Sequence, residues 1–309
     1  MLAALPLPYP FELSFMQRAL LAGVAVGAFA PLIGTFLVQR RMSLIGDGIG
    51  HIAFAGVAIG VVTGVHPLWT ALALSGAGAL GLEYLRSRRK ASGDLALALF
   101  FYSGIALGIV LLSRELEPTN IMGYLFGQIL TVNVAEVATI VAVGAAVVVG
   151  TLTVRRTLFA VVADEEWARV AGLPVGPMNT LVAATTAVTV VASMRAVGIL
   201  LVAGLMVLPV ASAQLLARSF RGTLIWASTI GVASVVVGLA ASRLWDVAPG
   251  GMIVLVAAGT FATVTVASST RARAHGKAER ATASIDGPDP AIAILADSHS
   301  ADRLARDGE

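Results

Sequence analysis

Residues 94–113 read DLALALFFYSGIALGIVLLS, a run in which Asp94 is the only charged side chain. A helix of roughly 20 mainly apolar residues is long enough to cross the hydrocarbon core of a bilayer, so this run predicts a transmembrane helix. Eight other stretches have the same character. The nine predicted spans lie at about residues 15–39, 44–63, 67–85, 94–113, 132–154, 178–193, 197–217, 222–242 and 251–270.

The composition of the whole chain supports the same class of protein. Of the 309 residues, 57% are hydrophobic and 13% are charged, and the mean hydropathy is +0.87. Soluble domains carry roughly 25% charged residues, so a soluble globular protein is excluded. We therefore expect an all-α, multi-pass protein embedded in the lipid of the inner or plasma membrane. The chain has no cysteine, which excludes disulfides, thiolate metal sites and a cysteine nucleophile.

Basic residues are distributed unevenly between the predicted loops, and this asymmetry sets the orientation. Cytoplasmic loops of membrane proteins carry an excess of Lys and Arg. When the C-terminus is placed in the cytoplasm and the nine spans alternate, 17 of the 21 Lys and Arg residues fall on the cytoplasmic side. The residues that remain outside are Arg18, Arg114, Arg195 and Arg243. Because the number of predicted spans is odd, the N-terminus then lies outside.

The spans divide the chain into three regions. We expect residues 1–14 to form an extracytoplasmic segment and residues 15–270 to form the transmembrane domain. Residues 271–309 are polar and rich in Ala, Asp and Arg, which predicts a disordered cytoplasmic tail. Within the membrane domain, residues 120–130 are apolar but too short to span the bilayer. We interpret them as a re-entrant or interfacial helix.

The stretch RRMSLIGDGIGH, residues 40–51, carries the best candidate for a binding site. Asp47 and His51 are four positions apart in the sequence, so they lie on one face of a helix. Both fall at or within the second span, where ionisable groups are costly and usually face a cavity or a partner. A carboxylate and an imidazole together suit zinc or manganese. The alternative is structural: Asp47 caps the helix, and His51 donates a hydrogen bond to a neighbouring carbonyl.

A second informative stretch, ADEEWARVAGLP at residues 163–174, lies on the predicted cytoplasmic side. Asp164 suits an N-cap, and Gly172 with Pro174 ends the helix after two turns. Such a helix presents Trp167 on one side and is suited to docking on a soluble partner. The alternative is an interfacial helix lying on lipid, which three acidic residues disfavour at an anionic leaflet. The residues assigned to docking are Asp164, Glu165, Glu166, Trp167, Arg169 and Gly172.

Other ionisable residues near the spans have simpler interpretations. Glu83 lies at the cytoplasmic end of the third span, where it is expected to pair with Arg86. Glu136 and Asp246 are expected to act as caps or interfacial anchors, and His66 as a solvated loop residue rather than a metal ligand. No G-x-x-x-x-G-K-[ST] sequence is present, so this chain does not bind ATP through a P-loop.

Five stretches, in order along residues 15–270, resemble the zinc/manganese permeases of ABC importers. Residues 40–53 resemble the family's RRMSLLGDALSHA sequence, and LFGQIL at residues 125–130 is similar to its LFGxIL segment. The remaining similar stretches are residues 164–174, residues 197–213 and residues 246–251. The tail, residues 271–309, has no counterpart.

The resemblance implies a large-importer (type II) permease that works as a homodimer around a central pathway. It further implies a cytoplasmic ATP-binding subunit beneath each copy and an extracytoplasmic metal-binding protein above. Asp47 and His51 match the positions of a transient metal site, and residues 164–174 match the coupling helix. In this picture the chain is a transport subunit and not an enzyme, has no permanently bound cofactor, and interacts with no nucleic acid. The transported ion is divalent: zinc, manganese or iron.

Three alternative functions remain open at this point. A permease for a metal chelate, such as a siderophore or cobalamin, needs a wide path without bare metal ligands. The Asp47–His51 pair would place such ligands on the path and therefore disfavours this function. A proton-driven secondary transporter needs no ATPase partner. A membrane enzyme is disfavoured because no nucleophile–base pair and no H-E-x-x-H metalloprotease motif is present.

Overall fold

The computed structural model describes residues 9–87, 93–113 and 119–285, and helices are the only regular secondary structure in these ranges. The helices are α1 Ser14–Gln39, α2 Ile45–Thr63, α3 Pro67–Ser87, α4 Gly93–Leu112, α5 Thr119–Phe126, the 3-10 turn η1 Ile129–Thr131, α6 Val134–Ala163, α7 Glu165–Val170, α8 Val175–Ser193, α9 Ile199–Leu216, α10 Phe220–Trp245 and α11 Pro249–Ile285. Nine of the described helices are long and apolar enough to cross a membrane. This confirms the all-α, nine-span prediction.

Helix α1 packs against four other helices, α6, α8, α9 and α10, and so lies at the centre of the bundle. Small residues let α1 and α10 approach closely: a Cβ added to Gly27 would lie 2.8 Å from the carbonyl oxygen of Gly231. The Ser228 hydroxyl of α10 donates a 2.9 Å hydrogen bond to the carbonyl of Ala28, which fixes the register of this contact. In lipid, such close packing and interhelical hydrogen bonds drive association.

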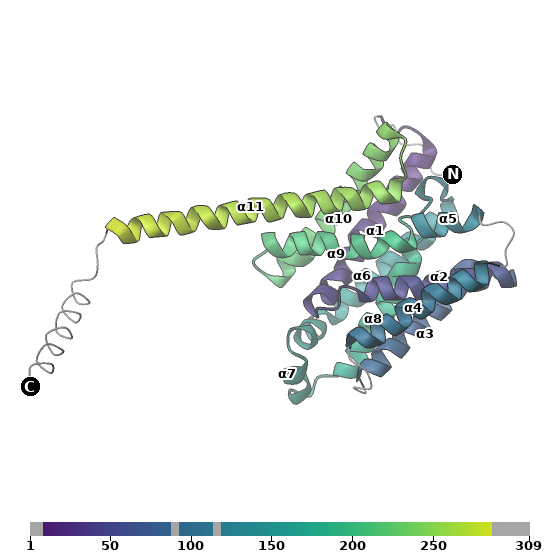
Figure 1. Cartoon of the computed structure of the whole chain (residues 1–309), viewed down its shortest axis with the longest axis horizontal. Coiled ribbons are helices and arrows are strands. Elements are labelled where there is room, and N and C mark those ends of the chain that lie inside the picture. The colour runs from purple at the N-terminus through teal and green to yellow at the C-terminus, as the bar shows by residue number, and fades with distance from the viewer. Residues whose placement is uncertain (1–8, 88–92, 114–118, 286–309) are drawn as a thin grey trace, which may run out of the picture. The chain divides into compact units, whose positions relative to one another are not determined.

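Helix α2, which carries Asp47 and His51, packs against α3, α4, α8 and α9. Figure 1 shows α2, α3 and α4 running side by side. A Cβ added to Gly104 of α4 would lie 2.8 Å from the backbone carbonyl of His51. The absence of a side chain at Gly104 therefore allows α4 to pack directly on the part of α2 that holds the candidate site.

Two helices extend beyond the ends predicted for them. Helix α6 continues to Ala163 rather than ending near residue 154, because Leu158, Val161 and Val162 remain buried beyond the basic residues. Helix α11 continues to Ile285, past residue 270 where the ninth span is predicted to end, and the disordered tail at residues 271–309 stays a prediction. Residues 271–285 are rich in Ala and Arg, which favour helix, and contain no proline. Residues 286–309 and residues 1–8 lie outside the described part of the chain.

The chain separates into two compact units, residues 1–262 and residues 263–309. The described part of the second unit is the C-terminal portion of α11, residues 263–285. The predicted interfacial segment at residues 120–130 forms α5 and η1, which confirms a short helix there. Its depth in the bilayer remains a prediction.

Candidate metal site and docking helix

The entry into α2 places Asp47 in the first helical turn. The chain leaves α1 through Arg41, whose φ is +57°, and the amide of Met42 donates to the carbonyl of Leu37 at 2.9 Å. The cap residue Leu44 provides no side-chain hydrogen bond. Asp47 therefore lies near the positive end of the helix dipole, which stabilises a carboxylate.

The two candidate ligands lie one helical turn apart and are both half-buried. In the part of the chain that the structure describes, the Asp47 carboxylate accepts no hydrogen bond, and the His51 ring makes none. The structural alternative, a capping Asp47 and a hydrogen-bonded His51, is thus not observed among these residues. The His51 ring instead contacts the Phe101 ring of α4 edge-on, with centroids 4.2 Å apart. This contact holds the imidazole in place while leaving its nitrogens available.

The number of ligands available from one copy is small. Among the described residues, no group of three or more His, Asp or Glu side chains is arranged to hold a metal ion. Zinc in proteins is usually four-coordinate. If the pair binds a metal ion, Asp47 and His51 supply only part of its coordination shell.

The docking helix α7 forms as the sequence predicts. The Asp164 side chain accepts a 2.9 Å hydrogen bond from the amide of Trp167, which confirms the N-cap. The chain leaves the helix at Gly172, which has a φ of +76°, and the amide of Leu173 donates to the carbonyl of Ala168 at 2.9 Å. The side chain of Ala168 is fully buried, whereas Trp167 and Val170 are 60% and 89% exposed.

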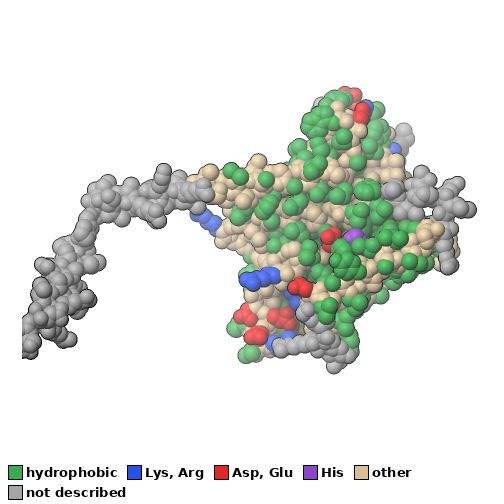
Figure 2. All heavy atoms as spheres, in the orientation of Figure 1, with side chains coloured by type: hydrophobic (Ala, Val, Ile, Leu, Met, Phe, Trp, Pro, Cys, Tyr) green, Lys and Arg blue, Asp and Glu red, His purple; other side chains and the backbone are tan. Residues whose placement is uncertain are grey.

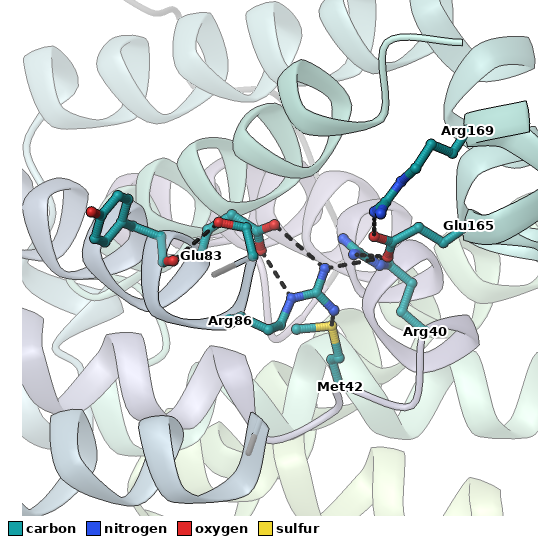
Figure 3. A network of polar contacts seen from close by, with 8 residues as sticks. Arg40, Met42, Glu83, Arg86, Glu165 and Arg169 are labelled. Atoms are coloured by element: carbon teal, nitrogen blue, oxygen red, sulfur yellow. Dashed lines mark hydrogen bonds and ion pairs between the residues drawn. The ribbon is translucent and has the colours of Figure 1, made fainter. Parts of the chain in front are cut away.

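Charged side chains gather around α7 and the nearby helix ends, while hydrophobic side chains cover most of the visible bundle (Figure 2). In this cluster Glu165 forms ion pairs with Arg40 at 3.4 Å, Arg86 at 3.6 Å and Arg169 at 3.1 Å (Figure 3). The predicted pairing of Glu83 with Arg86 is confirmed at 3.2 Å. Residues assigned to the cytoplasmic side on charge alone thus lie together.

Glu165 and Glu166, which the sequence grouped together, differ in their surroundings. Glu166 is exposed, whereas the Glu165 carboxylate contacts the ends of α1 and α3. Its contact with Arg40 spans 125 residues of sequence, so no local pattern indicates it. Burial, and next the neighbouring Arg86, lower the pKa of the Arg40 guanidinium, while the carboxylates of Glu83 and Glu165 oppose that shift.

A second polar cluster lies at the N-terminal end of α6, whereas α7 follows the C-terminal end of the same helix. Glu136 forms a capping box with Asn133, with hydrogen bonds of 2.9 and 3.0 Å, which confirms its predicted role as a cap. It also pairs with Arg195 at 2.9 Å. Both side chains, with His66 and Tyr124, line a cavity of about 470 Å³. Arg195 thus lies away from the Arg40 cluster, as its predicted outside position requires.

The model of the ABC 3 transport family matches residues 12–268. The chain is 32% identical to the manganese transport system membrane protein MntC of Listeria monocytogenes, covering 81% of this chain and 89% of the relative. It is 31% identical to the high-affinity zinc uptake system membrane protein ZnuB of Haemophilus influenzae, covering 81% and 96%.

A solved structure has the same architecture. PsaBC from Streptococcus pneumoniae, determined in complex with Fab, aligns with a TM-score of 0.75 and 30% sequence identity. The alignment covers 82% of this chain and 91% of that chain. The family match over residues 12–268 includes α2 and α7.

Proposed function

This chain belongs to the ABC 3 transport family, and from that premise we propose that it forms the translocation pathway of an ATP-driven importer of divalent metal ions. It is a metal-transport permease subunit and a multi-pass protein of the cell membrane, as its nine apolar helices and its relatives show. The proposal adds the direction of transport, the energy source and the residues that contact the ion.

The observation that carries the proposal is the pair Asp47 and His51 on α2. A half-buried carboxylate in an apolar helix, without a hydrogen bond or ion pair in the described structure, is costly unless it faces water or binds a cation. The adjacent imidazole supplies a nitrogen ligand one turn further into the span. We infer that the pair binds the ion transiently, with the remaining ligands coming from water or from a second copy of the chain.

The chemistry of the site restricts the cargo but leaves two metals open. Oxygen and nitrogen ligands without thiolate suit both manganese and zinc. The relatives named above include a manganese permease and a zinc permease, so they support the same pair of ions. We propose one of these two divalent ions as the substrate.

The energy source is proposed to be a separate ATP-binding subunit that docks on α7. The chain lacks a P-loop, and α7 presents Trp167 and Val170 to the solvent on the side that carries the basic cluster. On the opposite side, an extracytoplasmic metal-binding protein would deliver the ion. A homodimer would place two copies of α2 beside one pathway and supply the missing ligands.

The proposal is tested by transport in liposomes that contain the permease and its ATP-binding subunit, with the metal-binding protein outside. We expect uptake of Mn²⁺ or Zn²⁺ that requires ATP within the liposomes. Uptake driven by a proton gradient without ATP would establish a secondary transporter instead. Uptake of a metal chelate but of neither free ion would contradict the proposed cargo.

A further inference from the structure

The ion-pair cluster at Glu165 connects the docking helix to α1, whose C-terminal end leads into α2, and to α3, which packs against α2. Arg40 follows the last residue of α1, and Arg86 lies in the last turn of α3. One carboxylate oxygen of Glu165 contacts both guanidinium groups, at 3.4 and 3.6 Å. Figure 3 shows these side chains converging on Glu165 from separate elements. A single side chain of α7 thus holds the ends of α1 and α3 together.

The Arg40 side chain makes this contact difficult to replace. It is only 6% exposed, so water compensates little of its charge. A buried charge is stabilised only when it is paired and hydrogen-bonded, and removing one partner leaves the other uncompensated. Glu165 is the carboxylate with which Arg40 forms an ion pair among the described residues. The position of Arg40 therefore depends on the position of α7.

The cluster continues from Arg86 to the turn that precedes α2. The Arg86 guanidinium contacts both carboxylate oxygens of Glu83, at 3.2 and 3.4 Å, which fixes its orientation. Its remaining terminal nitrogen, Nη1, lies 3.3 Å from the sulfur of Met42. Arg86 thus touches α7 through Glu165 and the turn through Met42.

Backbone hydrogen bonds make the segment from Arg40 to Asp47 a rigid connection. The amide of Arg40 donates to the carbonyl of Phe36 at 3.3 Å, at the end of α1. At the start of α2, the amide of Ile45 donates to the carbonyl of Met42 at 3.1 Å, and the amide of Gly48 donates to that of Leu44 at 3.0 Å. A turn held at both ends moves as a body with the first turn of α2. A displacement of Arg40 or Met42 therefore reaches the Asp47 carboxylate.

We propose that Glu165 is a positioning residue that transmits movement of the docking helix to the Asp47–His51 site through Arg40, Arg86 and Met42. This inference rests on the proposed function, in which α7 contacts the ATP-binding subunit. It assigns Glu165 a role inside the permease, different from that of the exposed Trp167, which contacts the partner. Loss of Glu165 then separates ATP hydrolysis from transport without removing the partner.

The test compares Glu165→Gln with Glu166→Gln in the complete complex in liposomes. Both variants remove one acidic charge from the first turn of α7, but among the described residues only Glu165 forms ion pairs. Three quantities are measured: co-purification of the ATP-binding subunit, ATP hydrolysis, and Mn²⁺ and Zn²⁺ uptake per ATP hydrolysed. We expect Glu165→Gln to keep the first two and to reduce uptake per ATP by at least about tenfold, within the range of allosteric coupling. Glu166→Gln, at a residue assigned to the docking surface, should affect only co-purification, and Asp94→Asn, which changes an exposed acid of α4, should match the wild type in all three quantities.

A second readout follows the proposed path directly. Hydrogen exchange of the backbone over residues 40–48 should change when ATP is added to the wild-type complex, and this change should be absent in Glu165→Gln. If Glu165→Gln does not assemble, Arg86→Gln takes its place, since the Arg86 side chain is 23% exposed and its loss leaves the Glu165–Arg40 pair. The same loss of uptake per ATP is expected.

Equal uptake per ATP in the Glu165 and Glu166 variants would overturn the inference. An unchanged exchange response over residues 40–48 in Glu165→Gln would do the same. Failure of the proposed function gives a different result, because the wild-type complex itself would then show no ATP-dependent uptake of either ion.

Discussion

Trp167 and Ala168 are neighbours on α7 but face opposite environments: Trp167 is 60% exposed, whereas Ala168 is fully buried against Val161 and Val175. The buried alanine seats α7 on the ends of α6 and α8. The exposed tryptophan is the residue proposed to contact the ATP-binding subunit. The two residues allow the fold of α7 and its docking to be tested separately.

Trp167→Ala should weaken binding of the ATP-binding subunit while leaving the permease folded. Truncation of a tryptophan at the centre of an interface costs about 2 kcal/mol or more, or roughly a 30-fold loss of affinity. Co-purification and ATP-dependent uptake measure the effect. Trp69→Ala is the matched control, since Trp69 is 64% exposed but lines the cavity at the other end of the bundle. Equal binding by both variants would assign α7 to the lipid surface.

Ala168→Leu should disturb the seat of α7 rather than its docking surface. Added methylene groups in a packed site cost about 1–3 kcal/mol because neighbouring atoms must shift. We expect a lower thermal unfolding temperature of the isolated permease, which Trp167→Ala should not show. An unchanged unfolding temperature would mean that Ala168 is not a packing residue in the membrane-embedded protein.

Gly104→Val should impair transport by separating α4 from α2. The new side chain meets the backbone of His51, which cannot move without moving the helix. Gly76→Val is the control, because a Cβ added there has no neighbour within 4 Å. We expect metal uptake to fall for Gly104→Val alone, with both variants expressed in the membrane. Normal uptake by Gly104→Val would show that α2 tolerates a looser contact with α4.

Glu136→Ala should destabilise the outer end of α6 without affecting the docking of the ATP-binding subunit. The substitution removes the carboxylate that accepts the Asn133 amide, which is one half of the capping box, and the ion pair with Arg195, while the Asn133 side chain still caps the amide of residue 136. Loss of one hydrogen bond costs about 0.5–1.5 kcal/mol, and a partly exposed ion pair adds about 1 kcal/mol at most. Thermal unfolding in detergent measures this loss. Glu136→Gln, which retains an acceptor for the cap, should recover part of it.

The sequence predicts the spans well because each one is decided by local composition. Helix ends are less certain, since α6 and α11 continue past the predicted boundaries wherever good helix formers follow the apolar run. The N-cap at Asp164 and the pairing of Glu83 with Arg86 were also predictable, because both partners lie within three residues. Local spacing is enough for such contacts.

The contacts of Glu165 could not be predicted from the sequence. They join α7 to the ends of α1 and α3, and only the packing of these helices brings the side chains together. Sequence reasoning therefore grouped Glu165 with Glu166 on the docking surface. Any further ligands of the proposed metal site are also beyond the sequence, since no group of three or more His, Asp or Glu side chains gathers among the described residues.

The central claim is that Asp47 and His51 contact the transported ion, and ATP-dependent uptake of Mn²⁺ and Zn²⁺ by single variants tests it most directly. Loss of residues that merely support metal ligands costs about 10–100-fold, so Asp47→Asn and His51→Gln should each reduce uptake by about 100-fold. Asp94→Asn, which changes an exposed acid in the first turn of α4, should transport normally. Wild-type uptake of both ions by Asp47→Asn and His51→Gln, in complexes that hydrolyse ATP normally, would contradict the claim.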